Sequence, residues 1–120
     1  MKKLLLILFN LTILFGFSQE FAQTYFNAEI CKGDSCNKFQ SVNSFLFNLD
    51  GNSVKLYANS GDEQKYIYLS EIEKLTNDIG DEYQKVKTIN IESSTIWYFY
   101  IYKEHVFMFN AETDMLIGFY

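Results

Sequence analysis

The residues of this sequence that could carry redox or nucleophilic chemistry are few. Cys31 and Cys36 are the only cysteines and flank the polar segment 32–35 in CKGDSC, and His105 is the only histidine. Redox-active pairs usually have two intervening residues and begin a helix, and this pair fits neither description. In an oxidising compartment, two cysteines this close form a disulfide. We therefore predict a disulfide across a hairpin tip, which stabilises the fold by about 2 kcal/mol.

Gly33, Asp34 and Ser35 resemble the start of the sequence block of the GDSL serine hydrolases, which would make Ser35 a nucleophile. The resemblance ends after these three residues. Those enzymes carry an aspartate three residues before the histidine, because acyl transfer needs a base and its orienting partner. Here Tyr102 stands three residues before His105. We therefore predict that the protein is not an enzyme and has no catalytic residues.

The acidic segment 77–82, NDIGDE, places three carboxylates around a glycine. A calcium loop needs oxygen ligands at alternating positions and a distal glutamate that binds through both oxygens, and this segment has a different spacing. We predict no metal site and no cofactor.

Tyrosines gather on one face of each of two predicted strands. In the runs KYIYL and IWYFYIY they alternate with apolar residues. If the two runs share a sheet, they form a tyrosine ladder, and its flat rings with polar tips suit a ligand or a protein partner. The alternative is an ordinary core with hydroxyls at the rim. The tentative ligand or partner face comprises Tyr66, Tyr68, Tyr98, Tyr100 and Tyr102.

The run IWYFYIY, residues 96–102, is apolar on both faces, which is typical of a strand in the interior of a fold. We expect Trp97, Phe99 and Ile101 to join the main core. The opposite face must be covered by a helix, a second sheet, a ligand or another chain, because a bare apolar strand promotes aggregation.

Period-two alternation between turn residues recurs from residue 24 onward and predicts a mainly β fold. Asp50 and Gly51, between the alternating runs 45–49 and 54–58, predict a tight hairpin turn, since both residues adopt positive φ readily. Short polar turns join the last three predicted strands, which favours an antiparallel meander.

The segment 70–79 predicts one short helix. Ser70 and Glu73 have the spacing of a capping box, apolar residues recur at helical spacing, and Gly80 follows as a stop. The expected fold is therefore a small antiparallel β-meander of about seven to nine strands with this helix, as a curved sheet or a lipocalin-like barrel.

The first eighteen residues predict a cleaved secretory signal peptide. Lys2 and Lys3 precede an apolar run that is too short to span a bilayer, and small residues follow it. We expect residues 19–120 to form a single small domain with no stable membrane anchor. The location is then secreted, in the periplasm or the extracellular medium.

The charge balance argues against nucleic acid as a partner. The chain has ten Lys and Arg residues, fifteen Asp and Glu residues and a formal net charge of −5, and loss of the two signal lysines makes it more negative. Phosphate backbones repel such a surface. We expect a non-catalytic binding protein that holds a small apolar or amphipathic ligand on the tyrosine-rich face or in a barrel mouth. The alternative is a protein-interaction module, such as an inhibitor or accessory subunit.

Overall fold

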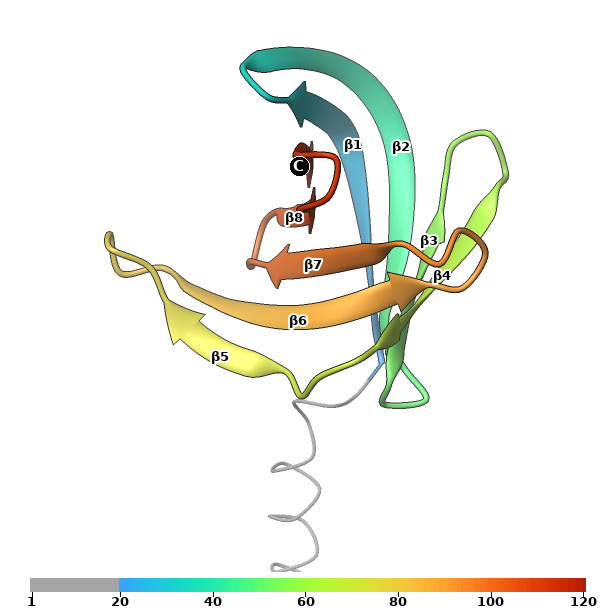
Figure 1. Cartoon of the computed structure of the whole chain (residues 1–120), viewed down its shortest axis with the longest axis vertical. Coiled ribbons are helices and arrows are strands. Elements are labelled where there is room, and N and C mark those ends of the chain that lie inside the picture. Colours follow the sequence, from blue (N-terminus) through green and yellow to red (C-terminus); the bar gives the residue numbers. More distant parts are fainter. Residues whose placement is uncertain (1–19) are drawn as a thin grey trace, which may run out of the picture.

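The structure is a computed structural model that describes residues 20–120 (Figure 1). The predicted signal peptide lies outside the described residues. Nine strands form one antiparallel sheet, which confirms the predicted mainly β fold. They are β1 (Phe21–Lys32), β2 (Ser35–Leu49), β3 (Ser53–Tyr57), β4 (Glu63–Tyr68), β5 (Glu73–Thr76), β6 (Glu82–Asn90), β7 (Ile96–Ile101), β8 (Val106–Asn110) and β9 (Met115–Phe119). In this part of the chain, no helix is long and apolar enough to cross a membrane.

Eight of the strands close into a barrel. The strand order is β4-β3-β2-β1-β9-β8-β7-β6-β5, and β4 also pairs with β6. This closing seam comprises three residue pairs, between residues 66–68 and 88–90. The ninth strand, β5, lies on the other side of β6 from β7 over residues 82–85. Of the two predicted architectures, the barrel is therefore the one that forms.

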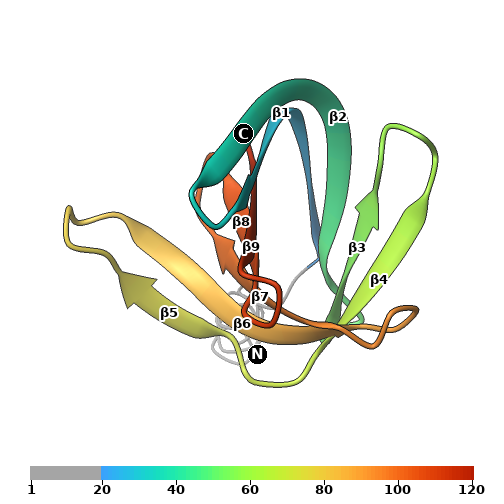
Figure 2. The same cartoon turned by 45° about the horizontal axis from the view of Figure 1, so that its top comes forward.

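Two hairpins extend beyond the barrel wall. The β1–β2 hairpin bends over at its tip, and the β5–β6 hairpin projects away from the barrel (Figures 1 and 2). Strand β2 pairs with β3 only between residues 44 and 49, so the pairing within residues 35–43 is with β1 alone. The predicted β2–β3 turn is confirmed, with φ angles of 55° at Asp50 and 75° at Gly51.

The predicted helix at 70–79 is wrong. Residues 73–76 form β5 and pair with β6 instead. The Ser70 hydroxyl, predicted to cap a helix, accepts a hydrogen bond from the backbone N–H of Lys87 at 3.1 Å. This contact ties the start of the segment to β6.

The turn after β5 explains why the remaining helix signals mislead. Asn77 Oδ1 accepts hydrogen bonds from the N–H groups of Ile79 and Asp81, at 3.1 and 2.9 Å. Gly80, with φ 92°, supplies a hairpin turn rather than a helix end. Because a helix of ten residues is marginal by itself, pairing with β6 decides the outcome.

The barrel interior is packed with aromatic and aliphatic side chains. Phe45 lies at its centre, with ring centroids 5.3 Å from Phe47, 5.0 Å from Phe119 and 6.4 Å from Phe99. As predicted, β7 turns Phe99 and Ile101 into this core, and Trp97 packs against it. The buried apolar residues are Tyr25, Ala28, Phe45, Phe47, Val54, Leu56, Tyr66, Val86, Phe99, Ile101, Val106, Met108 and Phe119.

Candidate functional site

The tyrosines predicted as a single binding face lie on two sides of the barrel wall. Tyr66 is only 3% exposed, and its ring lies 5.1 Å from that of Phe99 inside the barrel. Tyr68 also packs against the core. Tyr98 and Tyr100 alternate with Phe99 along β7, so they face outward. The structure does not bring the two groups together as one ladder.

The inner tyrosines use their hydroxyl groups within the fold. Tyr68 Oη donates to Asn48 Oδ1 at 2.8 Å and accepts from the Asn48 N–H at 3.2 Å. Tyr66 Oη donates to Gln64 Oε1 at 2.6 Å. Burial raises the pKa of Tyr68 to about 12 and also raises the pKa of Tyr66. These contacts match the core interpretation of Tyr66 and Tyr68.

The outward tyrosines belong to a half-buried group of rings on β6, β7 and β8 and in the turn between β7 and β8, here called the outer aromatic surface. Its members are Tyr83, Tyr98, Tyr100, Tyr102, His105 and Phe107. Tyr102 is stacked between Tyr83 and His105, with centroids 4.9 and 4.5 Å away. Lys85 Nζ lies 5.5 Å from the ring of Tyr98 and 5.7 Å from that of Tyr100. Neighbouring rings and a lysine therefore cover part of this face, for which we expected a helix, a second sheet, a ligand or another chain as the cover.

A cleft of about 530 Å³ opens at the end of the barrel where β1 begins and β7 ends. We call it the mouth cleft. Its aromatic and aliphatic lining comprises Phe21, Leu75, Tyr83, Ile101 and Tyr102. Its polar lining comprises Gln23, Lys74, Thr76, Glu82, Gln84 and Lys103. Of the five predicted tyrosines, only Tyr102 reaches this cleft.

Gln84 gives the mouth cleft a polar group that the fold leaves unused. Its side-chain Oε1 is buried without a hydrogen-bond partner, a condition shared within residues 20–120 only by the hydroxyl of Tyr25. Burying an acceptor in this way costs about 1–3 kcal/mol. A donor group on a ligand would remove that cost once rotation of the Gln84 side chain brings this atom into the cleft.

A second hollow of about 510 Å³ adjoins the mouth cleft. The two share Glu82, Tyr102 and Lys103. His105 lines the second hollow, where its ring stacks on Tyr102. The stacked rings of Tyr83 and Tyr102 therefore belong to both the mouth cleft and the outer aromatic surface.

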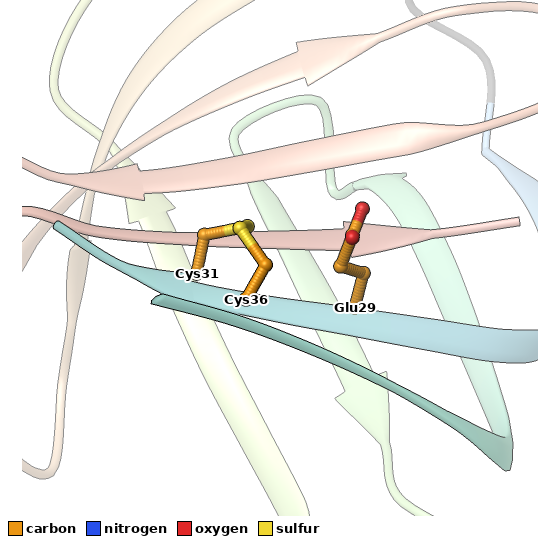
Figure 3. Close-up of side chains that lie close together, drawn as sticks. All are labelled: Glu29, Cys31 and Cys36. Atoms are coloured by element: carbon orange, nitrogen blue, oxygen red, sulfur yellow. A yellow bond between two sulfur atoms is a disulfide. The ribbon is translucent and has the colours of Figure 1, made fainter. Parts of the chain in front are cut away.

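The predicted disulfide is confirmed at the tip of the β1–β2 hairpin. Cys31 and Cys36 lie opposite each other in the ladder and are joined through their sulfur atoms. Glu29 lies two residues before Cys31, and its carboxylate projects to the same side of the hairpin (Figure 3). Sequence reasoning did not single out Glu29, although period-two spacing from Cys31 was the available signal.

The sequence prediction also missed most of the mouth cleft. Phe21, Gln84 and Lys103 come from three separated strands or strand ends and meet only after the barrel closes. The available signal was Gln84, a polar residue on the inward face of β6 together with Val86.

Comparisons with protein-family models, with curated proteins and with solved structures give no match for this chain.

Proposed function

We propose that this chain is a secreted, non-catalytic binding protein that holds a small amphipathic molecule in the mouth cleft. The observation that supports this proposal is a cleft with an unused buried acceptor at the end of an otherwise packed barrel. Small-molecule sites are usually largely apolar clefts of about 300–1,000 Å³ with a few polar groups that fix orientation. The mouth cleft lies within that size range.

The lining favours a ligand with two chemically different parts. Phe21 and Ile101 offer an apolar wall, and Gln84 Oε1 offers an acceptor for a hydroxyl or amine donor. Lys74, Lys103 and Glu82 give the lining two positive charges and one negative charge, so a strongly cationic ligand is not favoured. The non-catalytic part of the proposal rests on the sequence, in which no nucleophile, base and orienting partner form a recognisable set.

Secretion is the second part of the proposal. The disulfide between Cys31 and Cys36 suits an oxidising compartment. The amino-terminal sequence has the layout of a signal peptide.

One observation favours the alternative of a protein-interaction module. Residues 35–43 of β2 have an edge without a partner strand in the described chain. An extended peptide could add a strand there. An inhibitor or accessory subunit would use this edge rather than the mouth cleft.

Native mass spectrometry of the protein purified from its own compartment tests the main proposal. We expect a bound small-molecule mass that leaves on denaturation. Substituting Gln84→Leu removes the buried acceptor and should weaken binding of the recovered molecule about tenfold, the effect of about 1.4 kcal/mol. The matched control Gln40→Leu changes an exposed glutamine on β2 and should leave binding unchanged.

Two results would contradict the mouth cleft as the site. One is a protein that carries no small molecule and binds none from an extract of its compartment. The other is binding that tolerates Gln84→Leu but is lost in Tyr98→Ala, which would move the ligand to the outer aromatic surface.

A further inference from the structure

The tip of the β1–β2 hairpin gathers three side chains that can bind a metal, away from the mouth cleft. The two sulfurs of Cys31 and Cys36 and a carboxylate oxygen of Glu29 all lie within 4.8 Å of one another. No second group of three His, Cys, Asp or Glu side chains comes this close within residues 20–120. Figure 3 shows all three side chains on the same side of the hairpin.

The backbone holds these three residues in register. Cys31 pairs with Cys36 in the ladder, between the pairs Ile30 with Asn37 and Lys32 with Ser35. On its other side, β1 pairs with β9 along the same stretch. The backbone positions of the three residues are therefore held by strand pairing in addition to the disulfide.

We propose that reduction of the Cys31–Cys36 disulfide converts this group into a Zn²⁺ site with two thiolate ligands, the Glu29 carboxylate and a water molecule. Zinc takes four tetrahedral ligands at about 2.0–2.3 Å, which places ligand atoms about 3.3–3.8 Å apart. The three atoms already lie within 4.8 Å of one another, so breaking the sulfur–sulfur bond leaves only a short adjustment to reach that spacing. Thiolates favour zinc over magnesium or calcium.

The chemistry balances with a dithiol as the reductant. The disulfide accepts two electrons and two protons and becomes two thiols, while the dithiol is oxidised to its own disulfide. Binding of Zn²⁺ then displaces the two thiol protons into solvent. The oxidised hairpin offers only the carboxylate, so the state of the disulfide controls whether the metal binds.

The solvent exposure of the three side chains supports this redox-controlled metal site. The side chain of Cys36 is exposed, and those of Cys31 and Glu29 are partly exposed. A reductant and a metal ion therefore reach the group without unfolding of the barrel. Because the hairpin tip and the mouth cleft share no lining residue, this proposal does not depend on ligand binding in the mouth cleft.

Titration with Co²⁺, a spectroscopic substitute for Zn²⁺, tests the site. The protein is reduced with a phosphine, which is removed under nitrogen before the metal is added. We expect one Co²⁺ per chain with a sulfur-to-cobalt charge-transfer band that Zn²⁺ abolishes, and no band for the oxidised protein. A reduced protein without the band, equal binding by the oxidised protein, or one metal per two chains would overturn the proposal.

Three variants assign the ligands. Cys36→Ser should lose the charge-transfer band expected for a pair of thiolates, and Glu29→Gln should keep the band but bind Zn²⁺ about tenfold more weakly, or about 1.4 kcal/mol. The matched control Asp34→Asn removes a carboxylate from the same hairpin turn and should bind as the parent does. Equal weakening by Asp34→Asn would show general charge attraction instead of ligation by Glu29. Circular dichroism before metal addition must retain the strand signal, since an unfolded hairpin would also overturn the proposal.

Discussion

The tyrosines of β4 and those of β7 have the same spacing but opposite surroundings. Tyr66 and Tyr68 face the barrel interior, where Phe99 and Asn48 contact them. Tyr98 and Tyr100 face outward, and Lys85 lies near both rings. Alternation thus identifies which residues of a strand share a face, and only the packing of the whole barrel decides which face is inside.

The largest difference between the two groups should appear on truncation to alanine. Tyr66→Ala leaves a cavity beside Phe99 and should lower the free energy of unfolding by about 3–5 kcal/mol. Tyr98→Ala removes a half-buried ring and should cost about 1 kcal/mol. Denaturant unfolding of both variants measures the difference. Equal costs would mean that the outer aromatic surface contributes as much as the core.

Alkaline pH should destabilise the protein through ionisation of the buried Tyr68 hydroxyl group. The pKa of Tyr68 is raised by burial from about 10 to about 12. The folded state therefore favours the neutral hydroxyl, so this stabilisation is complete below pH 10 and is lost between about pH 10 and 12. A shift of this size corresponds to about 2–3 kcal/mol. Unfolding measured across this range should show a smaller decline in Tyr68→Phe, and an unchanged decline would assign the effect to other groups.

Removal of a single hydroxyl group should change the free energy of unfolding by a smaller amount. The change should still be larger for an inner tyrosine than for an outer one. Tyr68→Phe removes the 2.8 Å hydrogen bond from Tyr68 Oη to Asn48 Oδ1 and should cost about 1–2 kcal/mol. Tyr100→Phe keeps the ring that lies beside Lys85 and should change stability by less than about 0.5 kcal/mol. Thermal unfolding of the two matched variants provides the measurement. A larger loss for Tyr100→Phe would reverse the comparison.

The smallest expected effect concerns the outer side of β9. A Cβ atom at Gly118 would lie 3.0 Å from the ring of Phe107, so Gly118→Ala should cost about 0.5–1 kcal/mol as the ring moves. In a Phe107→Leu background the same change should be neutral or stabilising, because alanine is less flexible than glycine in the unfolded chain. A double-mutant cycle measures this coupling, and simple additivity would contradict the contact.

The predictable parts of the fold were those set by local chemistry. The alternation of β2 and β3 and the positive φ values of Asp50 and Gly51 required only neighbouring residues. The segment 73–76 was predicted as helix because its local pattern was helical, while its pairing partner β6 lies across a turn. Closure of the barrel could not be predicted either, because it also depends on pairing between distant residues. Strand β4 meets β6 through only three residue pairs.

The candidate sites could likewise be predicted only where their residues are close together in the sequence. The disulfide was predicted because Cys31 and Cys36 are close in sequence and face each other in one hairpin. The mouth cleft was not predicted, because Phe21, Gln84 and Lys103 are far apart in the chain and meet only at the barrel end. The role proposed for the five tyrosines stays a prediction, and the structure places Tyr66 inside the barrel and Tyr98 outside it.

The strands follow the chain around the barrel, so the order in which contacts form during folding is constrained. Every strand pairing except β1–β9 and β4–β6 joins consecutive strands. Hairpins form within microseconds, whereas pairing of Ala28 with Phe119 closes a loop of about 90 residues at a greater entropic cost. Substitutions in the β2–β3 hairpin should therefore slow folding, and those along β1–β9 should mainly speed unfolding. The ring of strands would then close last, and the β1–β9 ladder would determine how long the closed barrel persists.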